Sequence, residues 1–275
     1  MNIYLNVIYI IIIMISVNLI GGLGNQMFQI FCCIAYAKRN NLKFYLPTNL
    51  SSCSRSKTYW KTIFTNLKQY VKDVKLSKYN EINFNYNKIP LFNNKKLFGY
   101  FQSWKYFDDQ YDYIYELLKI DEFKKSYDFK ADCSMHFRLG DYKLPQFSHH
   151  HNILPYEYYD KAIKKLINKL NKDKLSILYF CEQEDNEMVL KNIKRLNKKY
   201  KNLFFIKAPD ELDDWEQMIL MSKCSHNIIA NSSFSWWGAY LNSNKSKIVI
   251  HPSNWFKVDK KTDDLFYKNC VKINL

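Results

Sequence analysis

The chain has 275 residues, of which 47% are hydrophobic and 17% aromatic, so it can bury a large core and is not intrinsically disordered. Its net charge of +15 suggests an anionic partner. The lysines are nevertheless spread along the chain, and no zinc finger, basic zipper or RNA-recognition motif is visible, so we expect no nucleic-acid partner.

The N-terminus is apolar enough to suggest a signal or an anchor. No lysine or arginine precedes Lys38, so the positive start of a signal peptide is missing. Residues 15–20 are predicted to be a buried strand, and a helix made of residues 1–14 would span roughly 21 Å, short of a hydrocarbon core of about 30 Å. We favour an apolar lead-in to that strand, with membrane association through residues 1–14 as the alternative.

The first half predicts a strand, a glycine turn and a helix over residues 15–39, which is how a nucleotide-binding α/β unit opens. A second strand is predicted at 44–47 and a helix at about 108–119. Residues 51–96 are rich in Lys, Asn and Tyr without a clear period, and no element is assigned there. The polar segment 120–130 is the best boundary, which predicts two domains, 1–125 and 126–275.

The second half alternates strands with helices, which predicts a parallel sheet covered on both faces. In such sheets the loops after the strand carboxyl ends collect the ligand. Strands are expected at 131–137, 175–181, 203–207, 227–230 and 247–251, and helices at about 156–171, 185–199, 213–222 and 233–242.

The cysteines indicate a reducing compartment. There are seven, an odd number, and none forms a C-x-x-C pair, which argues against a disulfide framework and against a zinc site. We therefore expect a cytoplasmic protein, with the anchored form as the alternative. Paired acids occur at 108–109, 213–214 and 263–264, but none has the D-x-D form of a metal-bridged sugar-nucleotide site, so no metal is expected.

The glycine turn from Gly21 to Gln26 opens a helix, and its exposed backbone N–H groups suit an anion. Met27 stands where a dinucleotide-binding pattern G-x-G-x-x-G would have its third glycine. No phosphate-binding G-x-x-x-x-G-K-[S/T] segment exists either. The turn therefore predicts an anion site without predicting NAD or a P-loop.

The segment from His136 to Asp141 follows a predicted strand and contains one of only four arginines, against 37 lysines. Arginine offers a planar fork for bidentate bonding to phosphate, which lysine does not. Two interpretations of Arg138 stay open on these residues: a phosphate contact, or a strand end with an ion pair to Asp141.

The segment 231–238 also follows a strand and opens a helix. Ser232 or Ser233 can cap this helix while its free N–H groups face a phosphate. The simpler interpretation is a serine cap with Trp236 and Trp237 in the core, and the two are compatible.

Four segments together carry a resemblance: GGLGNQMFQ at 21–29, GYFQSWKYF at 99–107, HFRLGDY at 136–142 and NSSFSWWGAYL at 231–241. In this order they resemble the α-1,2-fucosyltransferases of glycosyltransferase family 11. The resemblance implies a GT-B-like α/β fold, with two Rossmann-type parallel-sheet domains facing a cleft, the acceptor on the first and the donor on the second. It implies metal-independent, inverting transfer of fucose from GDP-β-L-fucose to a glycan acceptor, typically at O-2 of a β-galactoside, without a cofactor.

The resemblance also implies roles for individual residues. Asp141 is the carboxylate nearest the donor site in sequence, and we expect it to be the general base. This chain departs from the family at one position, since most members have a second arginine where this chain has Leu139. The other expected contacts are Arg138 at the diphosphate, His136 beside the donor, Asn25 and Gln26 near the transferred sugar, and Ser232, Ser233 and Phe234 around the phosphates.

Two alternatives to fucosyl transfer stay open. One is a catalytically impaired nucleotide- or carbohydrate-binding protein on the same fold, which the leucine at position 139 suggests. The other is a transferase that uses another GDP-sugar.

Overall fold

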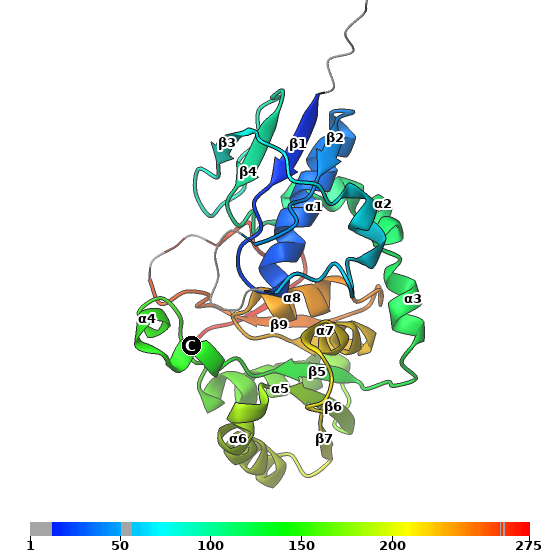
Figure 1. Ribbon diagram of the computed structural model, residues 1–275. Coiled ribbons are helices and arrows are strands. Elements are labelled where there is room, and N and C mark those ends of the chain that lie inside the picture. Colours follow the sequence, from blue (N-terminus) through cyan, green and yellow to red (C-terminus); the bar gives the residue numbers. More distant parts are fainter. Residues whose placement is uncertain (1–12, 51–56, 259, 261) are drawn as a thin grey trace, which may run out of the picture.

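The computed structural model describes residues 13–50, 57–258, 260 and 262–275, and they form two parallel sheets, one above the other in Figure 1. The first sheet has the strand order β2-β1-β4-β3 and the second β10-β9-β8-β5-β6-β7, with every pairing parallel. This confirms the predicted fold class. The strands are β1 (Met14–Val17), β2 (Lys43–Tyr45), β3 (Ser77–Asn80), β4 (Lys95–Phe98), β5 (Cys133–His136), β6 (Leu175–Phe180), β7 (Leu203–Lys207), β8 (His226–Ile228), β9 (Val249–Pro252) and β10 (Val271–Ile273).

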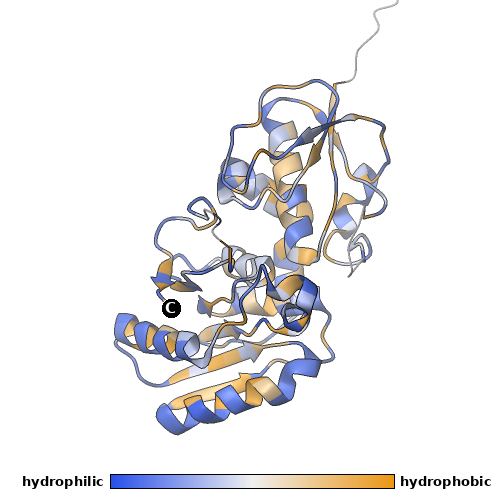
Figure 2. Cartoon of the chain, turned by 90° about the vertical axis from the view of Figure 1, so that its left-hand side faces the viewer, coloured by the Kyte–Doolittle hydropathy of each residue, from blue (hydrophilic) through white to orange (hydrophobic). Residues whose placement is uncertain are grey.

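The helices of the second sheet cover both of its faces. Helices α5 and α6 pack on one face, and α7 and α8 lie toward the first half of the molecule. Figure 2 shows the amphipathic pattern that this requires, with hydrophobic residues toward the strands and hydrophilic ones outward. The α-helices are α1 (Leu23–Arg39), α2 (Tyr111–Leu118), α3 (Ile120–Lys125), α4 (Pro145–Ser148), α5 (Tyr156–Leu170), α6 (Asn186–Lys199), α7 (Asp214–Lys223) and α8 (Ser233–Tyr240).

Helix α1 is buried on almost every side, from Leu23 to Ala37. It packs on β1 and β2 with one face and on α8 with another. A helix that is apolar around most of its circumference needs such burial on several sides. Helix α1 is therefore the element that joins the two halves of the molecule.

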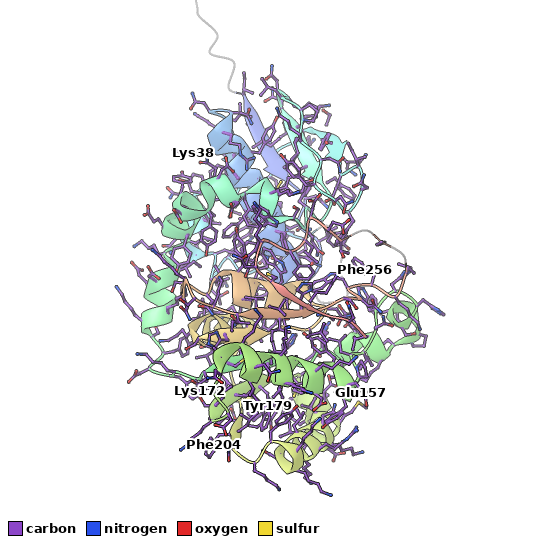
Figure 3. The ribbon with its side chains drawn as sticks, turned by 180° about the vertical axis from the view of Figure 1, so that it is seen from behind. Lys38, Glu157, Lys172, Tyr179, Phe204 and Phe256 are labelled. Atoms are coloured by element: carbon purple, nitrogen blue, oxygen red, sulfur yellow. The ribbon has the colours of Figure 1, made fainter. Side chains whose placement is uncertain are left out.

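Aromatic side chains form the contact between the halves. The ring centroid of Phe28 on α1 lies 4.5 Å from that of Trp236 on α8, and Phe31 lies 4.5 Å from Trp237. Both tryptophans are buried, as the sequence predicts. Seen from behind, side chains fill the space between the halves (Figure 3). One continuous hydrophobic cluster thus fixes how the two sheets are placed.

Several elements differ from those predicted. Helix α1 begins at Leu23, inside the predicted glycine turn, and the segment without an assignment contains β3 and the first residues of β4. The expected boundary loop contains α3, and β10 and α4 were not predicted. The strands of the first sheet end by Phe98 and those of the second begin at Cys133; the division between 125 and 126 itself stays a prediction.

In the described part of the chain, no helix is long and apolar enough to cross a membrane. The lead-in 1–14, except for its last two residues, lies outside the described residues. Membrane association through this segment therefore stays a prediction.

Candidate active site

The carboxyl ends of strands from both sheets lead into the same small region, where the starts of α1 and α8 meet. We refer to residues 21–26, 136–142, 182 and 231–234 as the junction site. Parallel α/β proteins bind ligands at such carboxyl ends.

The glycine turn shapes the first part of the junction site. Gly21 has φ +81°, a conformation that favours glycine, and an added Cβ there would lie 2.3 Å from Nδ2 of Asn25. Gly22 is the N-cap of α1, and no side chain caps the helix. At this helix start, the first backbone N–H groups are therefore not bonded to a capping side chain. Such free N–H groups at a helix start suit an anion.

The starts of α1 and α8 touch at Gly24. An added Cβ at this position would lie 2.5 Å from the backbone nitrogen of Phe234 and 2.5 Å from the carbonyl carbon of Ser233. Only a residue without a Cβ permits this approach, which brings two positive helix ends to one place.

The two amides of the glycine turn are engaged with the protein. Oδ1 of Asn25 accepts hydrogen bonds from Oγ of Ser233 at 2.8 Å and from Nε2 of Gln102 at 2.6 Å. Gln26 is fully buried, and its Nε2 donates to the carbonyls of Gly21 and Lys57 at 3.0 and 3.1 Å. Gln26 therefore supports the turn from behind, whereas Asn25 lies where α1 meets α8.

Arg138 lies between two carboxylates. Its Nη1 donates to Oε1 of Glu182 and its Nη2 to Oδ1 of Asp141. The guanidinium carbon lies 5.0 Å from the ring centroid of Tyr142, and the side chain is 16% exposed. The ion pair with Asp141, one of the two interpretations of the sequence, is thus present. It leaves the phosphate role open, because both partners are side chains that a ligand can displace.

Glu182 is the functional candidate that the sequence analysis missed. It follows β6 by two residues, as Arg138 follows β5, so the rule about strand carboxyl ends would have found it. An added Cβ on Gly140, which has φ +39°, would lie 2.7 Å from both Glu182 carboxylate oxygens. The glycine of the HFRLGD segment therefore allows this carboxylate to reach the arginine.

A second, buried acid anchors the same loop. Asp185 is 1% exposed and accepts a hydrogen bond from the backbone nitrogen of Gly140 at 2.7 Å and from Nζ of Lys143 at 2.5 Å. At the other end of the loop, the hydroxyl of Tyr142 donates to the carbonyl of Asn231 at 2.9 Å. These bonds connect the loop that carries Arg138 with the ends of β6 and β8, the strands on either side of β5.

His136 is buried at the end of β5, with its ring centroid 5.4 Å from that of Phe234. Burial, with a smaller contribution from the positive charge of Arg138, lowers its pKa to about 3. The imidazole is therefore neutral at physiological pH. Among the described residues its Nδ1, which is buried, has no hydrogen-bond partner.

Ser232 is the N-cap of α8, and its Oγ accepts a hydrogen bond from the backbone nitrogen of Phe234 at 3.3 Å. Of the two serines predicted as caps, Ser232 has this role. Ser233 instead donates its hydroxyl to Asn25. The helix start is thus stabilised without an acidic cap, which leaves its positive end free of a fixed counter-charge.

The structure therefore brings His136, Arg138, Asp141, Ser232 and Phe234 close together, with Asn25 and Ser233 at the contact between the halves. The assembly combines one arginine, one neutral histidine and two helix starts at the meeting point of two parallel α/β units. This defines a class: a two-unit α/β protein with two helix starts and an arginine, groups that bind anions, where its halves meet, the arginine being paired with two carboxylates.

Sequence comparison identifies the family. The model of glycosyl transferase family 11 matches residues 8–274, so the chain belongs to this family of glycosyltransferases. Two curated relatives from Escherichia coli are each 34% identical. The O-antigen biosynthesis glycosyltransferase WbnK aligns over 64% of this chain and 60% of its own, and an alpha-1,2-colitosyltransferase over 45% and 41%. The chain thus spans at most about three fifths of the length of these relatives.

Two solved structures superpose on much of this chain at low sequence identity. A mutant of Arabidopsis thaliana FUT1 in complex with GDP superposes with a TM-score of 0.48 and 12% identity, over 88% of this chain and 71% of that one. The glycosyl transferase family 9 protein from Veillonella parvula gives a TM-score of 0.43 and 11% identity, over 96% and 85%.

Proposed function

We propose that the chain transfers L-fucose from GDP-β-L-fucose to a sugar hydroxyl of a glycan, O-2 of a β-galactoside, with inversion and without a metal. Membership of glycosyl transferase family 11 supports the reaction class. The observation that carries the proposal in this chain is the contact of the α1 and α8 starts at Gly24, together with the bond from Tyr142, in the loop of Arg138, to the carbonyl of Asn231 just before α8.

In this proposal the diphosphate of the donor takes the place of the carboxylates on Arg138. The guanidinium offers two parallel N–H donors, and the start of α8 adds its backbone N–H groups. Together they stabilise the negative charge that develops on GDP as the bond to fucose breaks. No step requires a metal, because these groups supply the positive charge.

Displacement of the ion pair also gives Asp141 a role. A carboxylate released from Arg138 can accept the proton of the acceptor hydroxyl as it attacks the fucose. Glu182 loses the same partner and is the competing candidate for the general base. Neutral His136 does not add positive charge, and we assign it a hydrogen-bonding role beside the donor.

The remaining expected contacts belong to the same proposal. Asn25 would lie near the transferred sugar, with Gln26 behind it, and Ser232, Ser233 and Phe234 would surround the phosphates. Cytoplasmic location is proposed on the cysteine pattern, and no cofactor is proposed.

The decisive experiment incubates the purified chain with GDP-fucose and an array of β-galactoside and other glycan acceptors. We expect release of GDP together with a product that is heavier by one fucose residue, and linkage analysis should find it on O-2. Activity should persist in excess EDTA. Binding of GDP-fucose without a product on any acceptor would instead identify a catalytically impaired binding protein.

A second candidate donor follows from one comparison. A curated relative is named an alpha-1,2-colitosyltransferase, so another GDP-sugar is the alternative. The same assay with GDP-colitose and GDP-mannose in place of GDP-fucose separates these donors by their ratios of kcat/KM.

A further inference from the structure

A cavity of about 650 Å³ lies between the halves of the molecule, away from the junction site. It opens at the carboxyl end of α8, among Tyr240 and the residues that follow. Because α8 has eight residues, about 12 Å of helix separates this cavity from Ser233. Its volume is in the range of small-molecule binding sites.

Aromatic rings from both halves form much of the wall. The ring centroids of Tyr111 and Tyr240 are 5.0 Å apart with an interplanar angle of 89°, and those of Tyr240 and Tyr267 are 5.3 Å apart. Each ring is thus held edge-on by its neighbour, an arrangement that fixes flat apolar surfaces before a ligand arrives. The aromatic residues of the wall are Trp104, Tyr111, Tyr115, Tyr240 and Tyr267.

Hydrogen-bonding groups stand beside these rings. The hydroxyls of Tyr240 and Tyr115 donate to Asp108 and Asp121, each at 2.6 Å. A carboxylate that accepts one such bond keeps lone pairs for further donors. Asp112 is an exposed third acid of the wall. The cavity therefore presents several acceptors next to aromatic faces.

The charges of the cavity nearly cancel, which bears on the kind of ligand. Lys247 and Lys268 also line it. The Nζ of Lys247 donates to the carbonyls of Ala239 and Asn242 at 2.9 and 2.6 Å, so this ammonium caps α8. A third ammonium, of Lys124, lies 5.2 Å from the ring centroid of Tyr115. Three carboxylates and two ammonium groups line the cavity, with Lys124 beside its wall, and this largely balanced charge favours a neutral ligand over a cation or an anion.

We propose that this cavity binds a neutral saccharide unit, as a glycan-binding site separate from the site of transfer. The C–H faces of a sugar ring stack on tyrosine and tryptophan, and its hydroxyls donate to Asp108, Asp112 and Asp121. Such a site would hold one sugar of a glycan while the junction site acts on another sugar of the same glycan, or on a separate glycan molecule. The inference goes beyond the proposed transfer and does not depend on the identity of the donor.

The test is saturation-transfer-difference NMR with galactose, glucose, N-acetylglucosamine and L-fucose, each without a nucleotide sugar. Tyr115→Ala removes one wall, and we expect at least a roughly tenfold loss of affinity for the bound sugar. Asp112→Asn changes an exposed side chain without changing its shape, and it should weaken binding severalfold. Tyr113→Ala is the matched control, since Tyr113 is on the same helix and does not line the cavity. Arg138→Lys is the control for the junction site.

We expect both control variants to bind like the wild type. Circular dichroism shows whether Tyr115→Ala is folded, and Asp112→Asn keeps the test valid if it is not. The proposal is overturned if no sugar binds the wild type, or if Tyr115→Ala and Asp112→Asn bind as the wild type does. Preferential binding of tetramethylammonium would overturn it as well, because it would make the cavity a cation site. Failure of fucosyl transfer leaves these outcomes unchanged, so the two proposals are tested separately.

Discussion

Arg138 is the residue on which the proposed chemistry depends most. Arg138→Lys keeps the positive charge but removes the fork that now contacts Asp141 and Glu182. Loss of charge-assisted hydrogen bonds worth about 1.5–3 kcal/mol predicts a fall in kcat/KM of about 10- to 100-fold. Steady-state kinetics with GDP-fucose measure it.

The control for this prediction is Arg195→Lys. Arg195 stacks on Tyr156, with its guanidinium 3.6 Å from the ring centroid, and takes no part in the junction site. We expect this variant to keep its kcat/KM. Equal turnover by Arg138→Lys and the wild type would contradict bidentate contact with the diphosphate.

Leu139, which stands where most of the family has an arginine, is part of the hydrophobic core. The side chain is 4% exposed and belongs to the hydrophobic cluster beneath β5 and β6. Leu139→Arg therefore places a charge without a partner in an apolar site. We expect it to lower the free energy of unfolding by about 3 kcal/mol or more and not to raise activity.

Urea unfolding measures the effect of Leu139→Arg, with Leu144→Arg as the control. Leu144 is 45% exposed in the same loop, and an arginine there should cost little. A Leu139→Arg variant of wild-type stability and higher kcat/KM would show that this position can present an arginine to the donor.

At the scale of elements, the contact between α1 and α8 depends on one missing Cβ. In Gly24→Ala the methyl group would lie 2.5 Å from backbone atoms of Ser233 and Phe234, so the helices must separate. Overpacking of this kind typically costs about 1–3 kcal/mol, which exceeds the gain of about 1 kcal/mol in helix propensity. We expect lower stability and at least a roughly tenfold loss of kcat/KM, since the two helix starts no longer act together.

Gly22→Ala is the matched control, two residues away in the same turn. A Cβ at Gly22 meets no atom within 4 Å, and its φ of −73° suits any residue. Thermal unfolding and kinetics of the two variants should therefore differ clearly. Similar behaviour of both would mean that the helix contact at Gly24 is not needed for the site.

The elements show what the sequence could and could not predict. Strand β7 was predicted with the observed ends, because an apolar run stands between polar turns. Strands β3 and β4 were missed, since Ser77–Asn80 is largely exposed and Lys95–Phe98 has one fully buried residue. β4 is a strand because β1 provides a partner edge, and β3 because β4 does, a tertiary cause that local periodicity does not contain.

The functional site, like the fold, could be predicted from the sequence only in part. The segments around Arg138 and Ser232 were found because glycine, serine and arginine stand directly after apolar strands. The contact of Asn25 with Ser233, 208 residues apart, and the pairing of Arg138 with Glu182, 44 residues apart, arise only when the sheets assemble. Sequence periodicity predicts elements, whereas such pairings depend on the order of strands.

For the whole molecule, the buried histidines predict a dependence of stability on pH. Burial lowers the pKa of His136 to about 3 and those of His151 and His251 to about 4, from an ordinary value of 6.5. Between pH 6.5 and 4 the unfolded chain therefore binds protons that the folded chain does not, so stability falls as the pH falls. Each such histidine contributes up to about 1.4 kcal/mol per pH unit in this window. Burial lowers the pKa of His226 as well. Glu81, whose pKa burial raises, works in the opposite sense, but it is one group against four.

We accordingly expect the free energy of unfolding, measured by urea titration, to fall by at least about 2 kcal/mol from pH 7 to pH 5. His251→Gln should reduce this slope, because it removes one group that titrates only in the unfolded chain. The variant should be less stable at pH 7, since the ring stacks on Phe266 with centroids 3.5 Å apart. The slope, not the absolute stability, is therefore the quantity to compare. Equal stability of the wild type at pH 7 and pH 5 would mean that these histidines are protonated in the folded protein, and that His136 is a cation beside the donor.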